Sequence, residues 1–410
     1  MPPLPIRAYN VQRAGVRPLG ASGPAMASLG RPRQAWVWHA ELPVQESSTS
    51  VNLRHMYEPI RSGVVAGLQS YLHAHPLQGR SWNITSRVCS ESVMLINAWR
   101  SPSRARRVLE RKLQSLRAGD LFVWIGHASQ MAVPVSMLRS NGVHTVYYQL
   151  EPIESCTIYA LTRRTGMDRY NEVWDYSPTN SQVCRDSQLH LNDTVFRYVP
   201  VVALPDRVQA AQQPSEEKLA FLGTVAHRVQ CNQPPLRGST HSRGSMGNPV
   251  RRRRQPVPCN SYCKHRLEAW ANEGWLQIEG SAWSDQRLAA VLQSYGVYVN
   301  VHKACNDVRN PVSPRVSMLL SARALVISEH CHDLDERQFE GMVSFVPFED
   351  VSREFARLRA MSRAEREALA AMRAARFARR FAPHRVYEEA GVHELMRRLD
   401  RQLRVNPVVW

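Results

Sequence analysis

Short apolar, β-branched runs alternate with segments of helical periodicity along most of the chain. The clearest example spans residues 296–329, where two such runs, 297–301 and 325–328, flank a polar loop and a helix-period segment. Leu288 and Leu292 precede the first run at helical spacing. The order strand, loop, helix and strand is typical of a parallel α/β sheet.

The first half of the chain repeats this alternation. We expect strands at residues 35–39, 93–97, 121–125, 145–149, 172–176 and 197–199. Helical windows lie between them at residues 57–73, 103–116, 132–140 and 180–189. Strands that alternate with helices in this way build a doubly wound sheet, in which ligands bind beyond the carboxyl ends of the strands.

The second half predicts another α/β unit. Its expected strands are residues 219–222, 277–279, 297–301, 325–328 and 343–347. Its expected helices are residues 264–272 and 285–294, one that begins after Pro314 with Ser313 as N-cap, a long Arg/Ala-rich helix over 351–380 and an amphipathic helix over 385–404. The chain therefore predicts two doubly wound, Rossmann-like domains.

Composition divides the chain further. Residues 1–33 lack periodicity and predict a disordered tail, with an Arg-rich organelle transit peptide as the alternative. The first domain then covers 34–203, a polar, Pro-bracketed linker 204–217, the second domain 218–384, and a C-terminal helix and tail 385–410. Residues 229–262, dense in Pro, Gly, Ser and Arg, predict a disordered basic insert in the second domain, or an intron retained in the gene model.

The net charge of +18 is concentrated rather than spread. Residues 1–40 contribute +5 and residues 218–267 contribute +10, largely in segments without predicted structure. A nucleic-acid-binding fold would spread basic residues over a structured face, so we expect no nucleic-acid partner. The run Arg251–Arg254 leaves open a nuclear-localisation or polyanion-binding patch.

Two further features suggest a cytoplasmic protein. The eight cysteines are scattered without a dense framework, as free thiols in a reducing compartment are. No run approaches the roughly 20 apolar residues of a membrane-spanning helix. His227, Cys231, Cys259, Cys263 and His265 offer zinc-type ligands, but their spacing is not typical of a zinc site, and we expect no metal.

Arg315 is the first candidate for chemistry. It lies in the first turn of the helix that follows Pro314, beside the unpaired backbone N–H groups of that terminus. The helix dipole and these donors both favour an anionic group there.

Eight segments along the chain resemble GT-B glycosyltransferases, in particular the CgeB-like, family 1 type. They are residues 120–126, 143–152, 172–177, 197–200, 221–223, 299–303, 310–315 and 324–328. The resemblance implies a GT-B-like fold, with two Rossmann-like domains facing across a cleft and an activated sugar bound mainly by the second. It also implies a metal-independent transferase that needs no cofactor and uses a nucleotide-diphosphate sugar as substrate.

Site residues follow from this resemblance and from their positions. Gly223 lets backbone approach a phosphate, and Arg315 can hold a diphosphate by bidentate hydrogen bonds. The complete predicted donor-binding set is Gly223, His302, Lys303, Asn310, Arg315, Ser317 and Glu329.

On the acceptor side, His127 follows Gly126 at the end of a strand and is the candidate general base toward an acceptor hydroxyl. Glu151 and Asp175 also end strands on that side, although carboxylates there often cap helices or anchor loops.

Two positions depart from the pattern of many nucleotide-sugar enzymes of this fold. Met318 stands where a glutamate hydrogen-bonds the ribose, and Arg323 stands where glycine is usual. Glu329, or the acidic loop containing Asp333, Asp335 and Glu336, could supply the missing acceptor.

We therefore expect a glycosyltransferase that moves a sugar from a nucleotide-diphosphate donor to an unknown acceptor. The alternatives are a catalytically weak or inactive GT-B-like protein that binds a nucleotide or glycan, which Met318 and Arg323 favour, and a basic protein associated with nucleic acid through its Arg insert.

Overall fold

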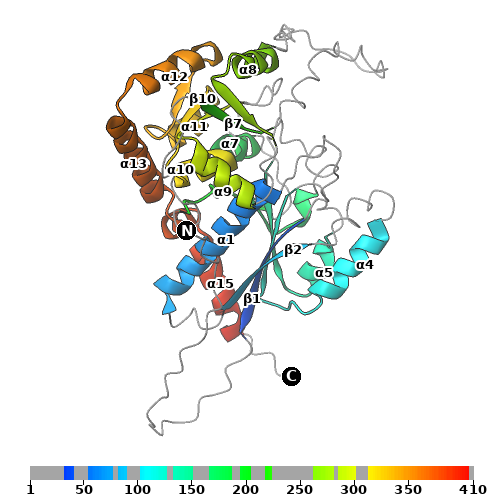
Figure 1. Ribbon diagram of the computed structural model, residues 1–410. Helices are drawn as coiled ribbons and strands as arrows, with labels where there is room; N and C mark the ends of the chain where they lie inside the picture. The colour runs from blue at the N-terminus through cyan, green and yellow to red at the C-terminus, as the bar shows by residue number, and fades with distance from the viewer. Residues whose placement is uncertain are drawn as a thin grey trace, which may run out of the picture.

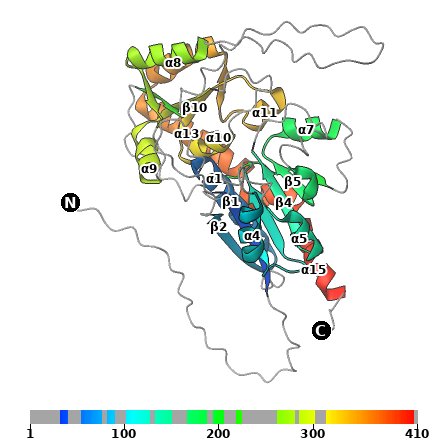
Figure 2. The same ribbon diagram turned by 90° about the vertical axis from the view of Figure 1, so that its right-hand side faces the viewer.

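The computed structural model of the protein describes residues 32–40, 54–76, 82–89, 102–126, 133–150, 166–186, 194–204, 218–223, 262–280, 285–301 and 313–405. It contains two β-sheets, and helices cover both faces of each (Figures 1 and 2). The predicted fold class, a pair of doubly wound α/β domains, is confirmed.

The first sheet is parallel and has six strands in the order β2-β1-β3-β4-β5-β6. Its strands are β1 (Arg33–Ala40), β2 (Trp82–Cys89), β3 (Leu121–Ile125), β4 (His144–Gln149), β5 (Glu172–Asp175) and β6 (Val195–Tyr198). Connections leave in opposite directions from β1 and β3, so the switch point of this sheet lies between their carboxyl ends.

The second sheet is also parallel and has five strands in the order β11-β10-β9-β7-β8. Its strands are β7 (Leu219–Leu222), β8 (Leu276–Glu279), β9 (Val297–Asn300), β10 (Leu325–Glu329) and β11 (Ser344–Val346). From β8 to β11 this sheet repeats the order of the first, and its switch point lies between β7 and β9.

Helices connect and cover these strands. They are α1 (Arg54–Ala74), α4 (Pro102–Leu113), α5 (Val135–Ser140), α7 (Pro178–Asp186), α8 (Tyr262–Asn272), α9 (Asp285–Ser294), α10 (Ser313–Ser321), α11 (Asp333–Gln338), α12 (Val351–Ala360), α13 (Arg363–Arg380), α14 (Pro383–Glu389) and α15 (Val392–Val405). Two short 3-10 helices are η3 (Met167–Arg169) and η7 (Phe348–Asp350).

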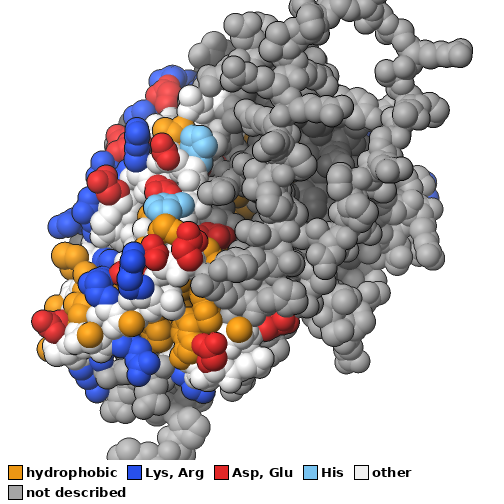
Figure 3. All heavy atoms as spheres, turned by 90° about the horizontal axis from the view of Figure 1, so that it is seen from above, with side chains coloured by type: hydrophobic (Ala, Val, Ile, Leu, Met, Phe, Trp, Pro, Cys, Tyr) orange, Lys and Arg blue, Asp and Glu red, His pale blue; other side chains and the backbone are white. Residues whose placement is uncertain are grey.

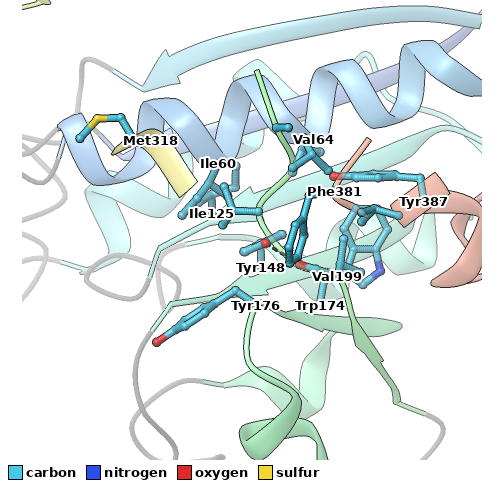
Figure 4. Close-up of a cluster of buried hydrophobic side chains, with 14 of the residues drawn as sticks. Ile60, Val64, Ile125, Tyr148, Trp174, Tyr176, Val199, Met318, Phe381 and Tyr387 are labelled. Carbon is cyan, nitrogen blue, oxygen red and sulfur yellow. Dashed lines mark hydrogen bonds between the residues drawn. The ribbon is translucent and has the colours of Figure 1, made fainter. Parts of the chain in front are cut away.

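A single apolar core joins the two domains. It contains Ile60 and Val64 of α1, Leu319 of α10, and Phe381 and Tyr387 from the last part of the chain (Figure 4). Separate clusters fill the opposite faces of the first and second sheets. Because apolar burial is the main favourable term in folding, this shared core holds the domains together.

The chain crosses between the domains twice, at residues 199–204 and 381–383, and we call these two segments the hinge. They run side by side, because Ala203 N–H donates to the carbonyl of Phe381 at 2.8 Å. After the hinge, α14 and α15 pack on α1 of the first domain (Figure 1). Asp400 of α15 accepts from the Trp82 indole at 3.1 Å and pairs with Arg33 at 3.2 Å.

The first sheet contains a strand that the sequence analysis missed. Residues 82–89 form β2, an edge strand parallel to β1. Its apolar residues alternate with polar ones, so it lacks the continuous apolar run that drew attention to residues 93–97, which lie outside the described residues. Arg33, assigned to the predicted tail, is instead the first residue of β1. The other predicted domain boundaries stay predictions.

Three predictions for the second half of the chain, two of helices and one of a loop, were wrong in detail. The expected helix over 351–380 is two helices, because Ser362 and Glu365 form a capping box that begins α13. The expected helix over 385–404 is divided into α14 and α15 at Gly391, whose φ of 71° suits glycine. The expected acidic loop contains the helix α11. The predicted insert 229–262 lies outside the described residues, apart from Tyr262, which begins α8.

Candidate functional site

The candidate site lies at the carboxyl ends of β7, β9 and β10 in the second sheet. Gly223 directly follows β7, Asn300 ends β9, and Ser328 lies beside Asn300 in the parallel pairing of β9 with β10. The switch point of this sheet is therefore the edge that carries these residues, and such an edge is where α/β sheets bind ligands.

Arg315 reaches this edge from the first turn of α10. Its Nη1 donates to Asn300 Oδ1 at 3.3 Å, and its guanidinium carbon lies 5.6 Å from the centroid of the Phe221 ring. A Cβ built on Gly223 would lie 3.3 Å from Arg315 Nη2. The structure thus brings together two of the predicted residues, Gly223 and Arg315, which are far apart in the sequence.

A buried hydrogen-bond chain fixes Arg315 in this position. Asn300 donates from Nδ2 to Ser328 Oγ at 3.0 Å, and Ser328 Oγ donates to the carbonyl of Glu329 at 3.0 Å. Asn300 and Ser328 are both fully buried. Because Asn300 uses its amide group on Ser328, its carbonyl oxygen is oriented to accept from Arg315.

Asn300 and Ser328 were not among the predicted site residues. The available signal was their polarity: each stands at the end of an apolar strand, where a buried polar side chain needs a partner. The predicted donor-binding residue Glu329 ends β10 and is half-buried, beside this hydrogen-bond chain.

The opposite face of α10 packs against the first domain. Ser317, another predicted donor-binding residue, is buried there and donates to the carbonyl of Val201 at 3.5 Å. Met318 is also buried and belongs to the shared core with Ile60 (Figure 4). The structure does not bring Ser317 into the network around Arg315; it places Ser317 and Met318 in the contact between domains.

Arg323 ends α10 rather than approaching a ligand. Its φ is 57°, its side chain is exposed, and the N–H of Ala324 donates to the carbonyl of Leu319 at 3.0 Å. This is the geometry of a helix terminus in which a left-handed residue is usually glycine. Helix termination therefore explains a glycine preference at position 323 without any ligand.

Asp335 is a buried contact between the domains and not a solvated acidic turn. Its Oδ2 accepts from the hydroxyls of Thr179 and of Ser177, the latter at 3.3 Å, and its Oδ1 accepts from Gln338 Nε2 at 3.2 Å. Burial raises the pKa of Asp335 to about 6, despite these hydrogen bonds. Since both oxygens are engaged, the earlier idea that Asp335 accepts from a ribose is not supported.

Asp175 anchors the chain between β5 and α7. Its carboxylate accepts from Ser177 N–H at 2.8 Å and from Asn180 Nδ2 at 3.1 Å. Burial raises the pKa of this fully enclosed carboxyl well above its usual value. These contacts are those of a loop anchor, the second of the two roles that we considered for it.

Four predicted site residues, His127, His302, Lys303 and Asn310, lie outside the described residues, as does Glu151. The structure does describe Gly126, which has a φ of 102° directly after β3. Only glycine adopts such a φ readily, so Gly126 turns the chain at the switch point of the first sheet, immediately before His127.

In the described part of the chain, no three His, Cys, Asp or Glu residues are grouped so that they could hold a metal ion. None of the helices described is both long and apolar enough to cross a membrane. The side chains of the five zinc-type residues are not among those described.

No family model matches the chain, and the comparison with curated proteins found no match either. Solved structures do resemble it. An "OtsA apo structure" aligns at 11% identity over 88% of this chain and 99% of its own, with a TM-score of 0.50. An α,α-trehalose-phosphate synthase (UDP-forming) from Burkholderia vietnamiensis aligns at 12% identity over 90% and 99%, with a TM-score of 0.48.

A further structure, titled as trehalose-6-phosphate from E. coli bound with UDP-2-fluoro glucose, aligns at 11% identity over 89% of this chain and 99% of its own, with a TM-score of 0.49. At these identities the likeness concerns the fold and not the activity. Together with the two parallel sheets and their common strand order, it shows that this chain has the fold of the GT-B glycosyltransferases.

Proposed function

We propose that the protein transfers a sugar from a nucleotide-diphosphate donor to an acceptor, and that Arg315 binds the donor diphosphate. The observation that carries this proposal is the position of Arg315 over Gly223 at the switch point between β7 and β9. A guanidinium group and a helix N-terminus at one edge suit a diphosphate. The CgeB-like resemblance also supports it.

The chemistry follows from the charge that develops as the sugar leaves. When the bond between the sugar and the diphosphate breaks, negative charge grows on the diphosphate oxygens. Arg315, held by Asn300, is oriented before the reaction to stabilise that charge. Lys303 and His302 would add further donors, and His127 would take the proton of the acceptor hydroxyl. No cofactor or metal enters this proposal.

The test is a donor screen by thermal shift and isothermal titration. UDP-glucose and UDP-GlcNAc come first, followed by other nucleotide sugars and an assay of donor hydrolysis. We expect at least one donor to raise the melting temperature and Arg315→Ala to weaken its binding by about 10- to 100-fold, as loss of a bidentate charged contact does.

Arg323→Ala is the matched control, because it removes the same charge from the exposed far end of the same helix. It should leave donor affinity unchanged. If no nucleotide sugar binds, or if Arg315→Ala and Arg323→Ala behave alike, the proposal is wrong.

Gly223→Ala sharpens the test. The added methyl group would press on Arg315 and Phe221, at 3.3 Å and 3.2 Å. We expect weaker donor binding together with a lower melting temperature, because the methyl group displaces Arg315 and the φ of 151° at position 223 strains a residue with a Cβ.

A second candidate, a GT-B-like protein that binds a nucleotide sugar without transferring it, is favoured by Met318. Its side chain lies in the shared core, so position 318 offers no carboxylate to a ribose. Donor binding that depends on Arg315, combined with no hydrolysis and no transfer to any acceptor tested, would select this candidate.

A further inference from the structure

A pocket of about 710 Å³ lies beside the hinge, apart from the candidate donor site. Its walls include Pro200 and Phe381, one from each crossing segment, and residues of β6, α11, α13 and α14. Neither Arg315 nor Gly223 lines it. Both domains and the hinge between them therefore contribute to the walls of one pocket, which is open to solvent on one side.

Five arginines and one carboxylate line this pocket, which we call the arginine pocket. Two of the arginines are already neutralised: Arg197 Nε lies 2.7 Å from Glu172, and Arg385 Nε lies 2.7 Å from Glu389. The remaining three are Arg376, Arg379 and Arg380. Among the described residues, no carboxylate lies within ion-pair distance of these three guanidinium groups.

This lack of pairing sets the three arginines apart from several exposed arginines of the C-terminal helices. Arg353 pairs with Asp350 at 2.9 Å, and Arg363 pairs with Glu367 at 2.8 Å. On the described part of the face in Figure 3, acidic and basic side chains are mixed. The helix dipole favours cations in the last turn of α13, but it does not extend to Arg376, one turn earlier.

The three unpaired arginines lie at positions i, i+3 and i+4 of α13, so they share one face of the helix. Arg376 packs over the backbone of Gly341, where a Cβ would lie 2.3 Å from its Nη1. Phe196, Phe381 and Val386 also line the pocket, and we call these three side chains its apolar floor. The pocket thus combines a concentrated positive charge with an apolar surface of small-molecule size.

We propose that the arginine pocket binds a small molecule that carries a phosphate group on a ring-shaped or otherwise apolar body. Guanidinium groups bind phosphate bidentately, and the three positive charges of these arginines exceed the two negative charges of a phosphate dianion. The apolar floor holds the body of the molecule. Because the walls come from both domains, binding stabilises their relative position, and the ligand raises the melting temperature of the protein.

Phenyl phosphate is the probe, tested by isothermal titration and thermal shift on the full chain at constant ionic strength. We expect it to bind more tightly than inorganic phosphate, because its ring meets the apolar floor, while phenol alone does not bind. The double variant Arg379→Ala with Arg380→Ala should weaken phenyl phosphate binding by roughly tenfold or more.

The matched control is Arg353→Ala with Arg363→Ala, which removes two charges from the same helical region outside the pocket. It should bind phenyl phosphate as the unchanged protein does. All four positions are exposed, so neither double variant is expected to impair folding.

Arg315→Ala separates this site from the proposed donor site. It should keep phenyl phosphate binding, whether or not the protein proves to be a glycosyltransferase. The proposal is overturned if both double variants bind phenyl phosphate equally well, or if Arg315→Ala alone abolishes binding. It is also overturned if a DNA duplex or anionic vesicles bind through Arg379 and Arg380 while phenyl phosphate does not.

Discussion

Two buried carboxylates, Glu172 and Asp335, show how similar burial can give opposite electrostatics. Both side chains are almost completely removed from solvent. Glu172, in β5, accepts from Arg197 at 2.7 Å and 3.0 Å and from the Trp174 indole at 2.9 Å. The hydrogen-bond donors to Asp335, in α11, are all neutral, and they include Ser177 and Thr179 of the other domain.

The two pKa values move in opposite directions. Burial alone raises the pKa of Glu172, but the donors His144 and Arg197 outweigh it and lower the pKa from 4.5 to about 2. No arginine pairs with Asp335, and burial outweighs the lowering effect of its hydrogen bonds and of His332, so its pKa rises from 3.8 to about 6. Asp335 in turn adds, through like-charge repulsion, to the raised pKa of Asp175, whose main cause is burial.

The difference in pKa distinguishes a contact that is independent of pH from one that depends on pH. The Glu172 group connects β5, β6 and, through Arg398 at 3.7 Å, α15, all in one half of the molecule. It stays ionised at any ordinary pH. The Asp335 group joins α11 to Ser177, directly before α7, and to Thr179 in its first turn, across the two domains. Its strength changes near pH 6, so we expect the contact between domains to respond to pH in a range where the Glu172 group does not.

The largest effect should come from Glu172→Gln. The substitution leaves Arg197 without its carboxylate, and removing one partner of a buried pair costs about 3 kcal/mol. Urea unfolding at neutral pH measures the loss. Glu367→Gln is the control, because both side chains of its pair with Arg363 at 2.8 Å are exposed, and its loss should be below about 1 kcal/mol. Equal losses for the two variants would contradict the role given to Glu172.

The next effect concerns the pH dependence of stability. Because the folded pKa of Asp335 is raised, the folded state binds more protons than the unfolded state between the two values. Its contribution to stability is complete below about pH 3.8 and is lost as pH rises through about 6. A rise of about two pKa units corresponds to ~3 kcal/mol.

Asp335→Asn should therefore flatten the decline in unfolding free energy between about pH 4 and pH 7, and it should be more stable than the unchanged protein at about pH 8. Asp333→Asn, exposed on the same helix, controls for the change in net charge. For Glu172 the sign is reversed: its contribution is present above about pH 4.5 and is lost toward about pH 2. A parallel decline in the Asp335→Asn variant would count against the pKa shift.

Local patterns in the sequence were sufficient for most of the fold. Continuous apolar runs identified β3, β7 and the core of β9 and β10, because central parallel strands are buried on both faces. The edge strand β2 and the short helix α11 escaped, since an edge strand is only half apolar and α11 has an acidic sequence. The apolar periodicity of a segment indicates which of its residues are buried. The two elements β2 and α11 instead depend on contacts with residues distant in the chain.

The candidate site could also be predicted in part from local patterns. Strand ends and a helix start identified Gly223 and Arg315, since parallel strands bring their carboxyl ends to one edge. Asn300 and Ser328 could not be assigned, because their hydrogen bond depends on the register between β9 and β10. The contact between Asp335 and Thr179 joins residues 156 positions apart, and no local pattern reports such a pairing.

The smallest expected effect is a difference in stability between two pH values. It is measured in two variants, each of which lacks one hydrogen-bond donor to one of the two carboxylates. Thr179→Val removes a hydroxyl that donates to Asp335 with little change in shape. A hydrogen bond to a charged group contributes about 1.5–3 kcal/mol and one to a neutral group about 0.5–1.5 kcal/mol. The loss of stability should therefore be greater at about pH 8, where Asp335 is ionised, than at about pH 5, where it is mostly protonated.

Trp174→Phe is the counterpart, because it removes the indole that donates to Glu172 at 2.9 Å. Glu172 is ionised at both pH values, so the cost of this change should be the same at about pH 5 and pH 8, whatever its size. For each variant, only the difference between the losses of stability at the two pH values is used. The cost of the packing lost with the larger ring is the same at both pH values and therefore cancels. If Trp174→Phe also costs more at higher pH, or if the cost of Thr179→Val does not change, the two carboxylates do not differ in the way their surroundings indicate.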